Sequence, residues 1–204
     1  MSKASKHKGI LITFEGPNGV GKSSLIDKVA DLLNISGLGT HLTKEPTNSS
    51  LGQFIRANED NYHGKILAYL VTLDRYFHLN NEILPALENG KIVLSDRYIE
   101  SSLVLQRLDG LDSEFIWDLN KFFYIPELSV LITAPVEVLE QRLSTRDSLT
   151  RFERQCSRRD ELDYYLDAAN YLAKRGFNVM TIDNGGVSIE KNATIIVNKI
   201  LAMA

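Results

Sequence analysis

The sequence predicts an α/β fold of the P-loop type, a three-layer α/β/α arrangement with a five-stranded, mostly parallel sheet and a helical lid. Two observations lead to this prediction. Short apolar runs alternate along the 204 residues with segments whose apolar side chains recur at helical spacing, as in chains built from βα units. The first apolar run is followed by a glycine-rich loop and then a helical segment, the order that a phosphate-binding loop requires.

Five short apolar runs, several of them β-branched, are expected to form the strands. In chain order they span residues 10–14, 40–44, 92–95, 128–133 and 178–182. Strands that alternate with helices form a mostly parallel sheet, and ligands then bind at the carboxyl ends of the strands. The chain shows no internal repeat or linker, so residues 1–204 are interpreted as one domain.

The helices are predicted from apolar residues that recur every three or four positions. One begins directly after the glycine-rich loop, the longest spans about residues 62–88, and the last spans residues 189–201. Pro85 is expected to kink or split the longest helix, because proline lacks the N–H that continues the helical ladder. Asn89 and Gly90 then end it, since glycine tolerates the left-handed turn at a helix C-terminus.

The glycine-rich loop, residues 16–23, reads G-P-N-G-V-G-K-S and fits the pattern G-x-x-x-x-G-K-S/T. Glycines let successive backbone N–H groups turn toward an anion, and the following helix start adds its unpaired N–H groups and positive dipole end. Lys22 is expected to reach the β- and γ-phosphates, and Ser23 to ligate Mg²⁺. The loop is predicted to bind ATP with Mg²⁺ through Gly16, Asn18, Gly19, Val20, Gly21, Lys22, Ser23 and Ser24.

A second polar group follows the predicted strand at residues 92–95. Asp96 and Arg97 come directly after this strand, so they are expected at the same edge of the sheet as the glycine-rich loop. A carboxylate there can hold Mg²⁺ or its water, and a guanidinium can grip phosphate oxygens with two hydrogen bonds. Asp96 is therefore a candidate metal ligand together with Ser23. The alternative is an exposed salt bridge at a helix start.

Composition limits the function classes. The formal net charge is −3, which argues against a general nucleic-acid binder, because affinity for a phosphate backbone needs an excess of lysine and arginine. No run approaches the roughly 18 apolar residues of a membrane span. Residues 1–8 lack the apolar core of a signal peptide and are expected to form a loose tail. The single cysteine, Cys156, cannot form an internal disulfide, which fits a cytoplasmic protein.

Further motifs fall in order along most of the chain. F-E-G opens the glycine-rich loop; T-K-E-P-T follows at residues 43–47, D-R at 74–75, I-L-P-A-L at 83–87, D-R-Y at 96–98 and T-R-F-E at 150–153. Each motif alone is weak evidence, but their joint order and spacing resemble the thymidylate kinase family. The resemblance implies an enzyme that transfers the γ-phosphoryl group of ATP to dTMP and gives dTDP.

The resemblance also assigns roles beyond the glycine-rich loop. It implies that Arg56 and Arg97 hold the phosphate of the acceptor nucleotide and that Arg75 contacts its base edge. Guanidinium groups suit this task because they pair with phosphate in a fixed fork geometry. Glu45 would hold one of these arginines or a water near the metal. The acceptor-binding residues implied in this way are Glu45, Arg56, Val71, Arg75, Arg97, Ser101, Leu105 and Gln106.

Residues 141–159 carry six arginines and resemble the flexible lid that closes over ATP in this family. Family members take a catalytic arginine from the glycine-rich loop or from the lid. Gly19 occupies the loop position, so Arg146 or Arg151 of the lid is expected to act with Lys22, Asp96 and Arg97 in catalysis. Arg142 is expected to stack on adenine. A charge-rich helix pair would give the same composition. The resemblance also implies a homodimer.

Three departures from the family pattern lie near the acceptor. Asn18 stands where the family usually has an acidic residue, Val71 where a phenylalanine stacks on the pyrimidine, and Leu105 where an aromatic crowds the sugar. The loss of two aromatics forfeits stacking worth roughly 1–3 kcal/mol per base. Binding of ATP is thus a firmer expectation than the identity of the acceptor.

These departures leave alternatives open. One is compensation by a neighbouring aromatic, namely Tyr69, Tyr98 or Phe54. A second is a kinase of the same fold that acts on another small phosphate acceptor, such as a modified pyrimidine nucleotide. A non-catalytic nucleotide switch is a third, but the N-K-x-D pattern of GTPases is missing, because Asn120-Lys121 is followed by two phenylalanines.

Overall fold

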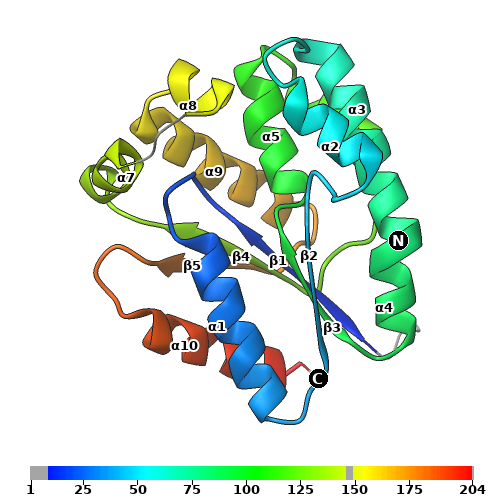
Figure 1. Cartoon of the computed structure of the whole chain (residues 1–204), viewed down its shortest axis with the longest axis vertical. Coiled ribbons are helices and arrows are strands. Elements are labelled where there is room, and N and C mark those ends of the chain that lie inside the picture. Colours follow the sequence, from blue (N-terminus) through cyan, green and yellow to red (C-terminus); the bar gives the residue numbers. More distant parts are fainter. Residues whose placement is uncertain (1–8, 146–148, 204) are drawn as a thin grey trace.

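The structure is a computed structural model that describes residues 9–145 and 149–203. Its centre is a sheet of β1 (Ile10–Glu15), β2 (Thr40–Lys44), β3 (Ile92–Asp96), β4 (Leu128–Thr133) and β5 (Val179–Asp183). The strands lie in the order β2-β3-β1-β4-β5, and every neighbouring pair is parallel (Figure 1). The predicted P-loop α/β fold with five strands is confirmed. The predicted tail at residues 1–8 lies outside the described residues.

The central strand β1 pairs with β3 on one side and with β4 on the other. The strand order therefore reverses at β1, and a ligand crevice is expected at the carboxyl end of such a strand. In the register of β1 and β3, Phe14 lies opposite Asp96. The glycine-rich loop follows β1 and the D-R-Y motif follows β3, so the sheet brings these two motifs together.

Helices cover both faces of the sheet (Figure 1). The helices α1 (Lys22–Ile35) and α10 (Ile189–Leu201) pack on one face, and α5 (Ile99–Leu108) and α9 (Arg158–Ala173) pack on the other. Successive side chains of β1 point to opposite faces of the sheet. Ile12 and Phe14 lie in the core beside α1 and α10, and Leu11 lies in the core beside α5 and α9. This alternation makes β1 a rigid base for the loop that follows it.

The long helix predicted at residues 62–88 is interrupted. It consists of α3 (Gly64–His78), a π-helical turn (Leu79–Ile83) and α4 (Leu84–Glu88). Pro85 lies in the first turn of α4, and the N–H of Leu84 donates to the carbonyl of Leu79, five residues back. The break therefore lies just before the proline, whose ring would crowd the carbonyl four residues earlier in a regular helix. Gly90, with φ +72°, follows the helix end as predicted.

The remaining helices are α2 (Ser50–Ala57), α6 (Ser113–Asn120), α7 (Val136–Ser144) and α8 (Arg151–Gln155). The segment predicted as a lid comprises the end of α7, all of α8 and the start of α9. Figure 1 shows α8 beside the end of α5, and an ion pair between Arg151 and Asp109 joins the two. Within the described ranges, no helix has the length and apolar character needed to cross a membrane.

Candidate active site

The glycine-rich loop connects β1 to α1 in a conformation that requires glycine. Gly16 has φ +140°, and a Cβ atom there would lie 2.2 Å from the carbonyl oxygen of Ile132. Gly21 has φ +92° directly before the first residue of α1. Side chains at either position would strain the backbone or clash with β4. The loop thereby presents the unpaired N–H groups of the first turn of α1 at the carboxyl edge of the sheet.

Lys22 begins α1, and its ammonium group folds back across the loop. Nζ donates to the carbonyl oxygens of Gly16 at 2.8 Å and Pro17 at 3.0 Å. Burial of this side chain, together with the nearby cation of Arg97, lowers the pKa of the ammonium from 10.5 to about 7. An anion beside Nζ favours the charged form. A phosphate group beside Nζ would therefore favour the protonated, positively charged form of Lys22.

Ser23 and Asp96 lie next to each other at the edge of the loop. Ser23 Oγ donates to Asp96 Oδ2 over 3.2 Å. The other carboxylate oxygen, Asp96 Oδ1, is buried and has no hydrogen-bond partner among the described residues. A hydroxyl and a free carboxylate oxygen are the hard oxygen donors that Mg²⁺ prefers. The two side chains therefore fit the predicted magnesium ion.

A pocket of about 420 Å³ brings together most of the residues predicted to bind ATP. Its lining comprises Asn18, Gly19, Gly21, Lys22, Ser23, Ser24, Asp96, Arg97 and Arg142. Arg142 reaches the pocket from the end of α7: Nη1 donates to the carbonyl of Val20 at 3.2 Å, and Nη2 donates to that of Asn184 at 3.1 Å. Arg142 thus lies beside the loop, on the side of α7 and of the turn after β5.

Arg97 stands in a strained turn between β3 and α5. Its φ is +76°, a value that residues other than glycine rarely adopt and that recurs at functional sites. The Arg97 N–H donates to the carbonyl of Phe14 at 3.0 Å. The guanidinium donates to Asn18 Oδ1 at 2.6 Å, and to Ser101 Oγ and the Tyr165 hydroxyl at 2.9 Å each. The turn therefore holds this cation directly beside the glycine-rich loop.

Glu15, the last residue of β1, supports this turn from below. Its carboxylate accepts from the backbone N–H of Tyr98 and from Ser101 Oγ, the latter at 2.8 Å. Complete burial, with the negative Glu100 nearby, raises the pKa of Glu15 from 4.5 to about 8. In the sequence, Glu15 stands out only as the middle residue of the F-E-G motif. The structure makes it a buried support of the Arg97 turn.

A second pocket, with a cavity of about 170 Å³, opens beside the first. It contains every residue that the resemblance assigned to the acceptor: Glu45, Arg56, Val71, Arg75, Arg97, Ser101, Leu105 and Gln106. Asn18 and Arg97 line both pockets and form the wall between them. Arg56 is exposed and donates to the carbonyl of Pro46. The Oε1 atom of Gln106 is buried without a hydrogen-bond partner among the described residues.

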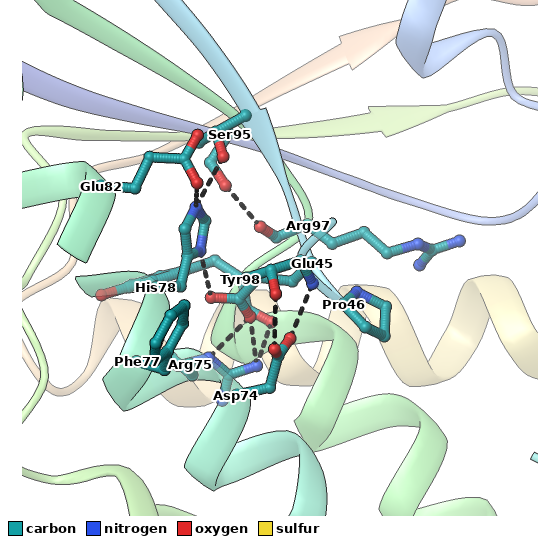
Figure 2. Close-up of polar contacts among 12 residues, drawn as sticks. Glu45, Pro46, Asp74, Arg75, Phe77, His78, Glu82, Ser95, Arg97 and Tyr98 are labelled. Atoms are coloured by element: carbon teal, nitrogen blue, oxygen red, sulfur yellow. Dashed lines mark hydrogen bonds and ion pairs between the residues drawn. The ribbon is translucent and has the colours of Figure 1, made fainter. Parts of the chain in front are cut away.

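A buried polar network builds the floor of this second pocket (Figure 2). Arg75 is 2% exposed, and its Nε donates to Glu45 Oε2 at 2.8 Å. Its other donors bind the Tyr98 carbonyl, Ser102 Oγ and Asn120 Oδ1 at 2.6–3.0 Å. Burial favours the neutral acid form of Glu45, but Arg75 and His78 together outweigh burial and hold the Glu45 pKa below its usual 4.5. Arg75 is thus a rigid part of the pocket wall.

His78 completes the network, although the sequence analysis gave it no role. The imidazole is fully buried, with Nδ1 3.2 Å from Glu45 Oε1 and Nε2 2.6 Å from Thr43 Oγ1 (Figure 2). Asp74, also buried, accepts from the N–H and hydroxyl of Thr47 at 2.7 and 2.6 Å. The loop that follows β2 is therefore tied to α3. The short spacing of Asp74, Arg75 and His78 on one helix is the signal that could have identified His78 as part of this network.

Of the two arginines of the lid predicted to be catalytic, Arg151 is described, and it binds away from the glycine-rich loop. Arg151 forms an ion pair with Asp109 at the end of α5, with Nη1 2.6 Å from Oδ1 and Nη2 3.0 Å from Oδ2. Arg146 lies outside the described residues. The residue after Arg151, Phe152, lines the acceptor pocket together with Thr150. Sequence reasoning named this motif but gave Phe152 no role.

Two of the aromatics considered as substitutes for a stacking phenylalanine lie outside the pocket lining. Tyr69 is 55% exposed and packs edge-on against Phe115, and Phe54 is 42% exposed and packs on Tyr62. Tyr98 does line the pocket. Another residue that sequence reasoning missed is Tyr165 of α9, whose hydroxyl accepts from Arg97; it is 68 residues away in the chain.

The fold and the site define a P-loop α/β protein with a nucleotide pocket and an adjoining acceptor pocket. The family model described as thymidylate kinase matches residues 14–192. A probable thymidylate kinase of Caldivirga maquilingensis is 39% identical over 149 residues, which cover 71% of this chain and 73% of the relative. The thymidylate kinase of Desulfotalea psychrophila is 33% identical over 207 residues, 98% of this chain and 100% of the relative. The chain belongs to the thymidylate kinase family.

Proposed function

We propose that the protein transfers the γ-phosphoryl group of ATP to dTMP and releases dTDP and ADP. The observation that carries this proposal is the wall of Asn18 and Arg97, which the nucleotide pocket and the acceptor pocket share. Two phosphate groups held on either side of one arginine lie close enough to react. The names of the similar proteins supply the acceptor, dTMP.

In the proposed reaction, a phosphate oxygen of dTMP attacks the γ-phosphorus of ATP in line. A bond forms to that phosphorus while its bond to the bridging oxygen of the β-phosphate breaks, and ADP leaves with the electron pair. The attacking oxygen is already anionic near neutral pH, so no general base is required. Catalysis then consists of alignment and stabilisation of charge.

Lys22, Arg97 and Arg142 are the described cations that line the nucleotide pocket. Lys22 would contact the β- and γ-phosphates, and Arg97, with Arg56, the acceptor phosphate. Mg²⁺ held by Ser23 and Asp96 would neutralise phosphate charge. Arg146 remains the candidate for a catalytic lid arginine, and Arg142 the candidate for contact with adenine.

The base of the acceptor would lie against the apolar side of the pocket. Val71 and Leu105 supply apolar contacts there, and Gln106, Ser101 and Arg75 supply polar ones. The free Oε1 of Gln106 suits an N–H of a pyrimidine base. Glu45 would act through Arg75, because it holds that guanidinium in place.

The proposed assembly is a homodimer formed through α3. This helix carries an apolar stripe that stays exposed in the single chain, with Ile66, Tyr69, Leu73 and Phe77 exposed by 59%, 55%, 58% and 49%. The four residues lie three or four positions apart, on one face. The family resemblance favours a second copy of the chain as the partner that covers this stripe. The proposed location of the protein is the cytoplasm, with which the free thiol of Cys156 is compatible.

The test is release of ADP from MgATP with dTMP, dUMP, UMP, dCMP, dGMP, thymidine or no acceptor. A selective response to dTMP is expected. Lys22→Ala should abolish transfer while the protein stays folded, and Lys28→Ala, on the same helix but outside the loop, should not. If the protein binds ATP but does not respond to dTMP, the assignment of dTMP as the acceptor is wrong, and another phosphate compound is favoured. Full activity of Lys22→Ala would overturn the role of the loop.

A further inference from the structure

The acceptor pocket has an apolar wall that comes from four helices. Ile55 of α2, Leu67 and Val71 of α3, Leu105 of α5 and Phe152 of α8 line it. Ile55, Leu67 and Phe152 also form one buried cluster, against which Val71 and Leu105 pack. A flat heterocyclic base gains most from such a wall when one side is a ring on which it can stack.

The described lining contains two aromatic side chains, Tyr98 and Phe152. The ring of Tyr98 is fully buried and already has neighbours: the Arg75 guanidinium carbon is 5.4 Å from its centroid, and Phe123 packs edge-on at 5.4 Å. Its hydroxyl donates to the carbonyl of Tyr124. Tyr98 therefore belongs to the framework of the pocket, and Phe152 is the aromatic available for a ligand.

The ring of Phe152 is oriented by its neighbour in α8. The guanidinium carbon of Arg151 lies 4.1 Å from the centroid of this ring, in the arrangement of a cation over an aromatic face. Arg151 thus covers one ring face. The ring also lines the acceptor pocket, so a ligand there meets the remaining surface of Phe152.

Arg151 is fixed in turn by Asp109, the residue that follows α5. The two side chains, each 5% exposed, form two hydrogen bonds of 2.6 and 3.0 Å. Asp109 Oδ2 also accepts from the backbone N–H of Gly64, the first residue of α3, at 3.0 Å. A single carboxylate therefore fastens α8 to α3 and α5, the two helices that supply Val71 and Leu105.

We propose that Phe152 is the stacking surface for the acceptor base and that the Arg151–Asp109 ion pair positions it. The inference rests on the proposed function, because it assumes that a pyrimidine nucleotide occupies this pocket. It assigns to the lid helix the aromatic contact that Val71 and Leu105 cannot give. Arg151 is then a positioning residue, and recognition of the base depends on the docking of α8 against Asp109.

The first test replaces Phe152 by leucine, which keeps apolar bulk but removes the ring. Stacking of a base on an aromatic side chain is worth about 1–3 kcal/mol, so the KM for dTMP should rise about 5- to 150-fold. The KM for ATP and the melting temperature should change little. Phe54→Leu, on the neighbouring α2 but outside the pocket lining, is the matched control and should leave both KM values unchanged.

The second test separates positioning from catalysis. Arg151→Ala and Asp109→Asn should each raise the KM for dTMP more than they lower kcat, and the double variant should be no worse than the poorer single variant. Arg151→Lys, which keeps the charge, should recover part of the loss. If Arg151 were catalytic, Arg151→Ala would lower kcat at unchanged KM, and Asp109→Asn would not share its effect.

Failure of this inference and failure of the proposed function are distinguishable. If the wild-type protein does not phosphorylate dTMP, the proposed function is wrong. If the wild-type protein is active and folded Phe152→Leu has the wild-type KM for dTMP, the stacking role is overturned and the function stands. A KM for ATP that rises as much as that for dTMP would also overturn it, because the defect would then not be specific to the acceptor pocket.

Discussion

Replacement of Arg75 by alanine tests whether the buried network beneath the acceptor pocket is a major source of stability. The guanidinium is 2% exposed and binds Glu45, Asn120, Ser102 and the Tyr98 carbonyl. Its removal leaves the buried carboxylate of Glu45 without its cation, and breaking one side of a buried ion pair costs about 3–5 kcal/mol. At about 2–4 °C per kcal/mol for a domain of this size, the melting temperature should fall by about 6–20 °C.

The pH dependence of this loss has a defined sign. Arg75, together with His78, holds the Glu45 pKa below 4.5 in the wild-type protein, although burial acts in the opposite direction. The stabilisation from Glu45 is therefore present above pH 4.5 and is lost as the pH falls through the depressed pKa. Without Arg75, burial raises this pKa, so the carboxyl of the variant takes up its proton at a higher pH. The stability difference should be widest near pH 7 and should narrow toward acid.

The assay is urea and thermal unfolding of wild type and Arg75→Ala at pH 7.5, 6 and 4.5. Lys121→Ala is the control, because Lys121 pairs with Asp118 at the surface, where the side chains are 44% and 66% exposed. Such exposed pairs contribute at most about 1 kcal/mol. A loss from Arg75→Ala no larger than that of the control, or one that does not change with pH, would refute the reasoning.

Three further predictions address the metal site, the buried acid and the dimer. Asp96→Asn should lower kcat about 100-fold and raise the Mg²⁺ concentration needed for half-maximal activity, measured by Mg²⁺ titration, while leaving the melting temperature nearly unchanged. Glu15→Gln can keep the hydrogen bonds of a protonated Glu15. Because the Glu15 pKa is about 8 in the folded protein, the stability of the wild type relative to this variant should decline from pH 4.5 to about 8. If urea unfolding gives the same difference in free energy of unfolding at every pH, the Glu15 pKa is not raised. Leu73→Arg, within the exposed stripe of α3, should convert a dimer to a monomer in sedimentation, and Ile195→Arg on α10 should not. If both variants sediment as dimers, α3 does not form the interface.

The sequence determined the sheet and the two motifs at its edge. All five strands lie within one residue of the ranges predicted from short apolar runs, because strand formation in a buried parallel sheet depends on local hydrophobicity. The glycine-rich loop was identified by its residue pattern, and Asp96-Arg97 by their position directly after a predicted strand. Pro85 predicted a break in the long helix, but the π-helical turn that makes the break lies before the proline.

Only the tertiary structure decided which partner each charged side chain takes. Arg75 and Arg151 are both arginines in short motifs, yet Arg75 lies in a buried network with Glu45, and Arg151 is fixed to Asp109, 42 residues earlier in the chain. Pairing over such separations depends on helix packing, and no local pattern encodes it. Phe152 enters the acceptor pocket for the same reason, because α8 is held against α5. The sequence thus determined the elements, the phosphate-binding motif and, through family resemblance, many residues of the acceptor pocket. Packing determined the buried partners of these residues and brought Phe152 among them.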